Sequence, residues 1–557
     1  MKAFLMYRDR DFDPQQLLAR RDKELRYHRA NEQGLELRQV LPWNEQALRQ
    51  DLGLDIVFNA MAFGDRFLFE VANVAVLSSL SDLDTIHYRQ HVYADCLKNA
   101  QVVRAIHQIA IDAIEGERKN SWSFFARHPS GILHRAVDVL QMFVGGLKRL
   151  RRIADQHVEK FESEGFSKLL SMLQRELSDD YFDEIETHLN KLKFRSGVLI
   201  SAHLGQGNKG KNYVLRRPHK DERSWLTRLL AEKPLAYSFQ LHPRDDAGAQ
   251  ALAQLNDRGV NLVANALAQS TDHILSFFHM LRTELAFYIG CLNLHAQLAQ
   301  MGEPMCFPVP AHAGERKLAL SNLHDVSLAL SMGKKIVGND LKANHKDIVV
   351  ITGANTGGKS TFLRSIGLAQ LMTQAGMFVS AESFAAEVCD GIFTHYKREE
   401  DASMESGKLD EELSRMSEIV DNIKSNALVL FNESFGSTNE REGSEIASQI
   451  VSALLDRNVK VFFVTHLYHF AHTFFARRSA TATFLRAERR PDGTRPFKLV
   501  EAEPLQTSYG ADLYRAIFGG SGERRRTARG SDCLADNRAG AAARPPITDS
   551  EATDRRG

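Results

Sequence analysis

The stretch "VVITGANTGGKST", residues 349–361, contains the phosphate-binding pattern G-x-x-x-x-G-K-[ST] from Gly353 to Thr361. An apolar, strand-like run precedes it and a helical pattern follows, which is the context in which this motif binds nucleoside triphosphates. Its glycines let backbone N–H groups close around phosphate oxygens, and the N-terminus of the following helix adds a favourable dipole. The expected nucleotide-binding residues are Gly353, Ala354, Asn355, Thr356, Gly357, Gly358, Lys359, Ser360 and Thr361.

The catalytic half of such a site is expected in "LVLFNESFGSTNEREG", residues 428–443. Its apolar start predicts a central strand, and the carboxyl end of such a strand lies where parallel sheets bind ligands. Glu433 is therefore expected to polarise the attacking water. Asn432 stands where a carboxylate normally holds Mg²⁺, and an amide keeps one acceptor oxygen but loses the charge. The predicted cofactors are ATP and Mg²⁺, and the predicted metal ligands are Ser360, Asn432 and Glu433.

The run "VKVFFVTH", residues 459–466, predicts the next buried strand, and His466 at its end is expected to sense the γ-phosphate as a catalytic partner of Glu433. The competing interpretations of the three motifs are a glycine-rich turn without a ligand, a carboxylate that only caps a turn, and a histidine satisfied in the core. A metal site on His466, His469 and His472 is disfavoured, because no carboxylate or cysteine completes the set.

The apolar patterns divide the chain into regions. From about residue 318, strand-like runs alternate with helices expected from Lys359 and Glu440, which predicts a parallel sheet covered on both faces. Upstream, the pattern is helical, and residues 272–302 predict a helix capped by Asp272 and stopped at Gly302. The expected parts are an N-terminal α/β region at 1–85, a helical region at 86–317 with a β-hairpin insertion at about 194–245, an ATPase domain at 318–519 and a disordered tail at 520–557.

Composition excludes several other classes of protein. The 71 basic and 70 acidic side chains nearly cancel, so any nucleic-acid contact must come from local basic patches. The five cysteines are scattered, which argues against a disulfide framework or a zinc site. No signal-peptide pattern or membrane-spanning apolar run is found, so a soluble, cytoplasmic protein without membrane contact is expected.

"VVITGANTGGKSTFLRSIGLAQLMTQAGMFVSAESFAA", followed by a strand ending in "NESFGSTNEREG" and then by "FFVTH", resembles the C-terminal ATPase of the MutS mismatch-repair family. The match extends over about 318–518. Further upstream, "LDTIHYRQHVYADCLKNAQVVRAI" resembles the early lever segment of that family. The resemblance implies an α/β P-loop NTPase of the ABC type, with a mostly parallel sheet, preceded by a long α-helical lever region with a small β insertion.

The resemblance also implies a homodimer with composite nucleotide sites. In the family, the phosphate loop faces a signature segment of the other subunit, and the counterpart here is near Ser406 and Gly407. A helix with an apolar face is expected directly after them. By the same correspondence Asn355 lies near the nucleotide, Thr438 lies in the loop after Glu433, and Ile336 or Val337 lies beside the base.

Two departures bear on mismatch recognition. The family reads mismatches with an aromatic residue two positions before a glutamate, whereas "RFLFE" places Phe69 directly beside Glu70. The 85 residues ahead of the lever segment are also fewer than the usual mismatch-binding and connector domains need. The sequence therefore predicts a MutS-like protein without the usual N-terminal mismatch-binding domain.

Two functions remain open at this point. The first is an ATP-driven clamp on duplex, mismatched or branched DNA, which serves mismatch repair or related repair and recombination. The second is an ATP-driven protein-interaction switch without DNA binding, which the near-neutral charge favours. Candidate DNA contacts in the hairpin are Lys209, Lys211, Arg216, Arg217 and Lys220, and weaker candidates are Lys148, Arg149, Arg151 and Arg152, since such a run is usually a solvated helix face.

Overall fold

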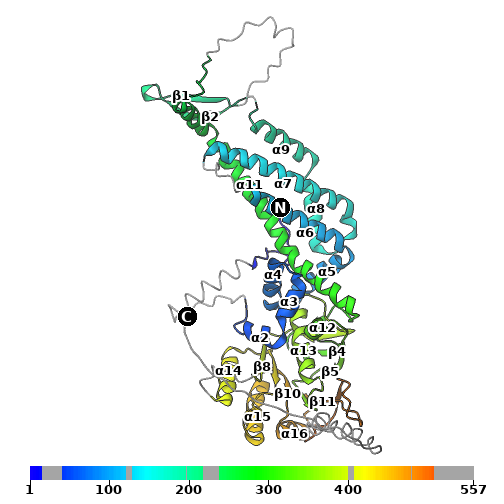
Figure 1. Ribbon diagram of the computed structural model, residues 1–557. Coiled ribbons are helices and arrows are strands. Elements are labelled where there is room, and N and C mark those ends of the chain that lie inside the picture. Colours follow the sequence, from blue (N-terminus) through cyan, green and yellow to red (C-terminus); the bar gives the residue numbers. More distant parts are fainter. Residues whose placement is uncertain are drawn as a thin grey trace, which may run out of the picture. The chain divides into compact units, whose positions relative to one another are not determined.

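The chain divides into two compact units, Met1–Gln506 and Thr507–Gly557. The structure is a computed structural model, and it describes residues 1–14, 41–120, 128–195, 197–216, 238–398, 407–477 and 479–506. All of these residues belong to the first unit, whose elements are labelled in Figure 1. The tail predicted at 520–557 lies outside the described residues.

The described part of residues 1–85 is helical. α2 (Glu45–Leu52), α3 (Leu54–Ala62) and α4 (Arg66–Leu77) follow one another closely, and residues 1–14 and 41–85 contain no strand. The expected α/β character is therefore wrong for these residues. In α3 the buried side chains recur every three or four positions, which is the spacing of one helix face and not of a strand.

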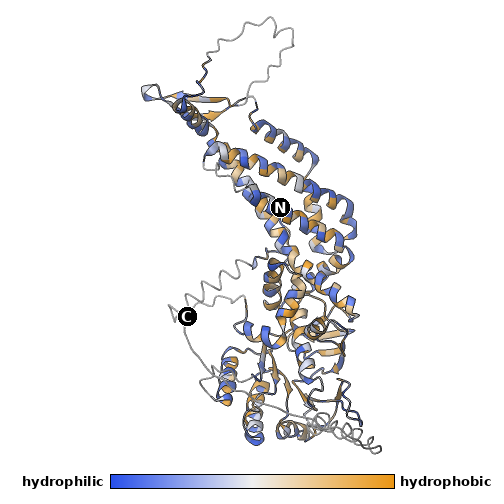
Figure 2. Ribbon diagram, in the orientation of Figure 1, coloured by the Kyte–Doolittle hydropathy of each residue, from blue (hydrophilic) through white to orange (hydrophobic). Residues whose placement is uncertain are grey.

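The next stretch consists of helices, as expected. Asp82, Ser163 and Ser178 accept hydrogen bonds from backbone N–H groups at three of the helix starts, so short polar side chains define where these helices begin. In Figure 2 hydrophobic and hydrophilic residues alternate along these helices, as expected for helices with one buried face. The helices are α5 (Leu83–Lys98), α6 (Ala100–Asn120), α7 (Pro129–His157), α8 (Glu164–Glu176) and α9 (Asp179–Leu192).

A single helix of 56 residues, α11 (Asp246–Met301), packs against α6 and α7 (Figure 1). Its N-cap is Asp245, so the prediction that Asp272 caps the helix is wrong; Asp272 lies inside it. A carboxylate can cap only where the preceding backbone leaves the helix, and here the helix continues upstream. The predicted end is confirmed, because Gly302 adopts a left-handed φ of 76°. Among the described helices, none is both long and apolar enough to cross a membrane.

The predicted hairpin is present near the start of α11. β1 (Ile200–Leu204) and β2 (Gly210–Leu215) pair antiparallel. Both strands contact α11, and a Cβ placed on Gly259 would lie 2.3 Å from the Ile200 side chain, so this glycine lets the hairpin approach the helix. Arg217 and Lys220 lie outside the described residues.

The C-terminal part contains a six-stranded sheet in the order β12-β11-β6-β10-β9-β8, which is parallel except for β12. The predicted strands and the helices from Lys359 and Glu440 are confirmed, and alternate residues of β6 enter two different hydrophobic cores on the two faces of the sheet. The elements are β6 (Ile348–Gly353), α13 (Lys359–Gln374), β8 (Ile392–Tyr396), α14 (Lys408–Asn422), β9 (Leu428–Asn432), α15 (Glu440–Asp456), β10 (Lys460–Val464), α16 (Tyr468–Ala476), β11 (Ala482–Ala487) and β12 (Leu499–Glu501).

A second sheet has four strands in the order β3-β7-β4-β5. The short helix α12 (Val326–Met332) connects β4 to β5 along the chain. Its first strand precedes residue 318, where the ATPase domain was expected to begin. The parallel partner of that strand lies more than seventy positions along the chain, since Val309 pairs with Ala385, so no local pattern announces it. The strands are β3 (Val309–Ala311), β4 (Leu318–Leu323), β5 (Asn339–Lys342) and β7 (Ser383–Glu387).

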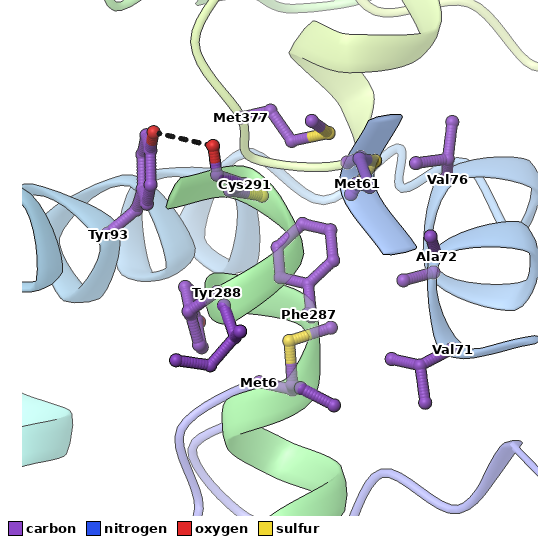
Figure 3. Close-up of a cluster of buried hydrophobic side chains, with 14 of the residues drawn as sticks. Met6, Met61, Val71, Ala72, Val76, Tyr93, Phe287, Tyr288, Cys291 and Met377 are labelled. Carbon is purple, nitrogen blue, oxygen red and sulfur yellow. Dashed lines mark hydrogen bonds between the residues drawn. The ribbon is translucent and has the colours of Figure 1, made fainter. Parts of the chain in front are cut away.

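One hydrophobic core joins the helical region to the C-terminal part. Figure 3 shows Phe287, Tyr288 and Cys291 of α11 among buried side chains from α3 and α4, with Met377, which follows α13, beside them. The Tyr93 hydroxyl donates to the Cys291 carbonyl oxygen at 3.3 Å. The long helix therefore shares buried contacts with the segment that follows the phosphate-loop helix.

Candidate nucleotide-binding site

Three motifs meet at one edge of the six-stranded sheet. β6, β9 and β10 are adjacent and parallel, with Val464 paired to both Ile351 and Asn432. The residues that follow the carboxyl ends of these strands therefore lie side by side. The structure thus brings together the phosphate loop, the Asn432–Glu433 pair and His466, which precedes α16 as expected.

The phosphate loop has the backbone that its glycines permit. Gly353 and Gly358 have φ values of 107° and 90°, and a Cβ on Gly357 would lie 2.7 Å from Ala487 and 2.9 Å from the Ala354 carbonyl oxygen. Larger residues at these positions would strain or crowd the loop. Gly358 precedes the first residue of α13 and offers no side-chain cap, so the helix N-terminus keeps N–H groups for an anion.

Lys359 points into the loop. Its Nζ donates to the carbonyl oxygens of Gly353 and Ala354 at 3.1 and 3.0 Å, and the residue is only 4% exposed. Burial lowers the pKa of Lys359, and the charge of Arg495 acts in the same direction, while Glu433 opposes them. The ammonium group therefore occupies the centre of the cradle in which phosphate oxygens are expected.

Ser360 and Asn432 are in direct contact. The Ser360 hydroxyl donates to Asn432 Oδ1 at 2.9 Å, and the Asn432 carbonyl oxygen accepts from the Lys397 N–H at 3.0 Å. Together with the Glu433 carboxylate, these side chains offer only oxygen ligands, which suits Mg²⁺. The donor set therefore fits a magnesium ion that also relies on phosphate oxygens and water.

Glu433 is held in a strained conformation beside His466. Its φ is 56°, a left-handed value that is uncommon for a residue with a side chain, and its N–H donates to the Val464 carbonyl oxygen at 2.8 Å. His466 Nε2 lies 2.9 Å from Glu433 Oε1. This hydrogen bond holds the pKa of Glu433 below its usual range, although burial opposes the shift. The carboxylate is therefore ionised at neutral pH and oriented by the imidazole.

A cavity of about 460 Å³ lies beside the phosphate loop. Ile336 and Val337, the residues expected beside the base, line it together with Thr356 and Thr361 of the loop and its helix. Phe497 also lines the cavity and was not predicted. A planar base fits between such apolar side chains.

Arg495 is a second residue that the sequence did not identify. It lies between β11 and β12, and its Nη1 donates to the Thr356 hydroxyl. Its charge reaches Lys359, whose pKa it lowers. The only sequence signal was a charge-rich run, "RAERRPDGTRPFK", which says nothing about which residue it faces.

The loop that follows Glu433 is fastened to α14 through the buried Glu412. The Glu412 carboxylate accepts from the Phe435 N–H at 2.6 Å and from the Ser437 hydroxyl at 2.8 Å. His395 Nε2 donates to the Glu412 carbonyl oxygen at 2.9 Å, and its Nδ1 lies 2.7 Å from Ser434 Oγ. Burial lowers the pKa of His395 to about 4, so the ring is neutral at pH 7. The catalytic loop and α14 therefore form one hydrogen-bonded unit.

Two other residues predicted from the family resemblance, Gly407 and Thr438, lie at the starts of α14 and α15. Gly407 is the N-cap of α14 and is exposed, whereas Ser406 lies outside the described residues. Thr438 donates to Glu442 in the first turn of α15. The apolar face predicted for α14 is only partly covered, since Leu413 and Val420 are 37% and 39% exposed while Met416 and Ile419 are buried.

The basic candidates fall into two groups. Lys209, Lys211 and Arg216 are exposed on the hairpin, and Arg216 donates to the Ser201 hydroxyl. On α7, three of the four candidates are paired with carboxylates: Lys148 with Glu186, Arg149 with Asp112 and Arg151 with Asp155; the fourth, Arg152, is exposed. The hairpin is therefore the better surface for phosphate contacts.

Two family models match this chain: the MutS2 N-terminal domain over residues 81–301 and MutS domain V over residues 349–518. Relatives include DNA mismatch repair protein MutS of Lactobacillus delbrueckii subsp. bulgaricus, 31% identical over 222 residues, which are 38% of this chain and 26% of that protein. MutS of Thermus aquaticus is 31% identical over 33% of this chain and 22% of its own length. DNA mismatch repair protein MSH3 of Candida glabrata is 28% identical over 45% of this chain and 27% of its own length. The matched region thus spans about a quarter of each relative.

Proposed function

Because the chain belongs to the MutS family, we propose that it is an ATPase of the P-loop, ABC type that couples ATP binding and hydrolysis to its hold on DNA. The observation that carries this proposal is the meeting of three groups at one sheet edge: the phosphate loop, the Ser360–Asn432 contact and the Glu433–His466 pair. The relatives are named as DNA mismatch repair proteins, which supports a role in mismatch repair or a related process.

In the proposed site the loop N–H groups and Lys359 bind the β- and γ-phosphates, and the base enters the cavity between Ile336 and Phe497. Ser360, Asn432 and Glu433 would hold Mg²⁺, which neutralises charge on the phosphates when bound. Glu433 accepts a hydrogen bond from the attacking water and orients it toward the γ-phosphorus. His466 holds the Glu433 carboxylate in position and would sense the γ-phosphate. The products are ADP and phosphate.

Asn432 stands where a carboxylate normally holds Mg²⁺, which predicts how much Mg²⁺ the ATPase requires. Because Asn432 contributes an oxygen without a charge, Asn432→Asp should lower the Mg²⁺ concentration for half-maximal ATPase activity about fivefold, or roughly 1 kcal/mol for one partly solvated charge contact. The measurement is ATPase rate against Mg²⁺ at saturating ATP, with Asn439→Asp as a matched control on the neighbouring cap of α15. Superimposed curves for Asn432→Asp and wild type would show that residue 432 lies outside the metal shell.

DNA is the proposed partner of the hairpin. Because Lys209 and Lys211 are exposed and close together on the hairpin, they offer two phosphate contacts. Replacing both by Ala should weaken duplex binding and reduce the slope of log K against log salt by about 1.8, since each duplex phosphate contact contributes about 0.9. Fluorescence anisotropy across a salt series measures the slope. Lys148→Ala, whose ammonium pairs with Glu186, is the control and should leave the slope unchanged.

The second candidate function is an ATP-driven protein-interaction switch. The observation that favours it is the pairing of three of the four α7 candidates with carboxylates, which reduces the positive charge that this helix can offer to DNA. A wild-type chain that bound neither duplex nor branched DNA at low salt would support the switch and reject the clamp. An unchanged slope in the double variant would only reject the hairpin as the contact surface.

We also propose a homodimer in which Gly407, at the exposed start of α14, faces the nucleotide of the partner subunit. Glu412 ties that helix to the loop beside the chain's own Glu433, so each subunit's catalytic loop and its dimer-facing helix would move together. Light scattering with and without ATP tests this proposal. A monomer under both conditions at micromolar concentration would count against it.

A further inference from the structure

The carboxyl end of α11 lies against the wall of the nucleotide cavity. The helix ends in a Schellman-type turn, in which the N–H of Gly302 donates to Ala299 O at 3.0 Å and the N–H of Glu303 donates to Leu298 O at 3.1 Å. Glu303 is thus the first residue beyond the left-handed glycine, and its side chain is 0% exposed. Burying a carboxylate costs free energy unless hydrogen bonds or an opposite charge compensate, so the partners of Glu303 matter.

Glu303 has two partners, one on each side. Its Oε1 accepts a hydrogen bond from the backbone N–H of Ile336 at 2.9 Å. Its Oε2 contacts Nδ1 of His324, although the two atoms do not have the alignment of a hydrogen bond. The opposite ring nitrogen of His324 lies 3.1 Å from Asn322 Oδ1. A single carboxylate therefore links the end of α11, the cavity wall and the end of β4.

The segment 333–339 packs directly against His324 and Asn322. A Cβ on Gly338 would lie 2.4 Å from His324 Nε2 and 2.2 Å from Asn322 Oδ1, so the backbone rests directly on these side chains. Farther along, Asn339 donates to the Phe497 carbonyl oxygen at 3.2 Å and accepts from the Leu499 N–H at 2.8 Å. Asn339 therefore ties the segment to Phe497, which also lines the cavity, while Glu303 holds the middle of the segment at Ile336.

We infer that Glu303 is a positioning residue that sets the base-binding wall and transmits occupancy of the cavity by a nucleotide base to α11. The inference rests on the proposed ATP site and extends it. A base that packs against Ile336 must shift or stiffen the segment whose N–H bonds to Glu303, and Glu303 is joined to the last turn of α11 through its own N–H. The hairpin contacts α11 near Gly259, 42 residues before Met301, so at 1.5 Å per residue the helix spans roughly 63 Å between the two sites.

If Glu303 positions the base-binding wall, its replacement should weaken the binding of ligands that carry a base and leave the binding of ligands without a base almost unchanged. Inorganic tripolyphosphate can occupy the phosphate loop without entering the cavity, whereas ATP fills both. In the full-length chain, Glu303→Ala should weaken ATP binding about tenfold, because the Ile336 N–H loses a buried charged acceptor. Tripolyphosphate binding should change by less than about twofold. Glu303→Gln keeps an acceptor oxygen for Ile336 and should restore most of the ATP affinity.

The measurements are equilibrium binding of ATP and of tripolyphosphate to each variant, and amide hydrogen exchange at Ile336 and in the last turn of α11. In wild type, ATP should slow exchange at both places and tripolyphosphate at neither. The matched control is Glu382→Ala, whose exposed carboxylate accepts from Asn322 but does not touch the segment. The exchange comparison in wild type needs no variant, so it tests transmission from the base to α11 even if Glu303→Ala does not fold, and Glu303→Gln then tests the residue.

The outcomes distinguish a wrong role for Glu303 from a wrongly proposed ATP site. Equal weakening of ATP and tripolyphosphate in Glu303→Ala, or equal exchange effects of both ligands in wild type, would overturn the inference. A wild-type chain that bound neither ligand would show that the ATP site itself is wrongly proposed, and the inference would fall with it. A wild-type chain that bound both, with Glu303→Ala behaving like wild type, would reject only the role of Glu303.

Discussion

Replacing Glu433 by Gln should lower the ATP hydrolysis rate by at least about 100-fold, within the range usual for a positioned general base, while ATP still binds. The carboxylate is expected to accept a hydrogen bond from the attacking water, and a neutral amide of the same shape cannot accept the developing proton. The hydrogen bond to His466 keeps the pKa of Glu433 below its usual range, so wild type has the ionised carboxylate throughout the neutral pH range. The measurement is single-turnover hydrolysis together with equilibrium ATP binding.

Glu445→Gln is the matched control for this prediction. Glu445 is an exposed carboxylate on α15, the helix that follows the catalytic loop, so it tests loss of charge without loss of the proposed base. It should hydrolyse ATP at the wild-type rate. If Glu433→Gln also did so, the water would be activated by another group and the role assigned to Glu433 would be wrong.

The parts of the site that the sequence predicted are those in which the relevant signal is local. The phosphate loop needs glycines at Gly353 and Gly358 because those positions have left-handed φ values, and the requirement is visible in the residues themselves. Asn432, Glu433 and His466 follow apolar runs, and parallel strands place their carboxyl ends together. The spacing of motifs on adjacent strands was therefore enough to predict that these side chains meet.

The parts that the sequence did not predict depend on contacts between distant positions. Arg495 meets Thr356 across 139 positions, and Glu412 on α14 meets Phe435 in the loop between β9 and α15. Helical or strand periodicity predicts neither of these contacts. Both depend on how the helices, strands and loops pack against one another in the folded chain. The same reason explains the first strand of the four-stranded sheet, whose partner Ala385 is remote in sequence. Asp272 failed as a cap for a different reason: the helical pattern continued upstream in weaker, more polar form.

Replacing Lys359 by Ala should raise the Kd for ATP by at least about 100-fold, since an ammonium group in the phosphate cradle makes charge-assisted hydrogen bonds with two phosphates. The folded chain should tolerate the change. Burial lowers the pKa of Lys359, which means that folding disfavours its charged form, so removing the ammonium relieves that cost. The carbonyl oxygens of Gly353 and Ala354 lose a donor in exchange, which offsets part of the gain. We therefore expect the thermal midpoint without nucleotide to stay within about 3 °C of wild type.

The control is Lys346→Ala, because the half-buried Lys346 donates to the Ala480 carbonyl oxygen and lies before β6 instead of after it. It should bind ATP as wild type does. Isothermal titration and a thermal scan of the three proteins separate binding from stability. A Lys359→Ala chain that bound ATP normally would show that the loop holds phosphate through its backbone alone. A variant that lost binding only because its midpoint fell far below that of wild type would show that Lys359 supports the fold, and that its bonds to Gly353 and Ala354 outweigh the cost of burying its charge.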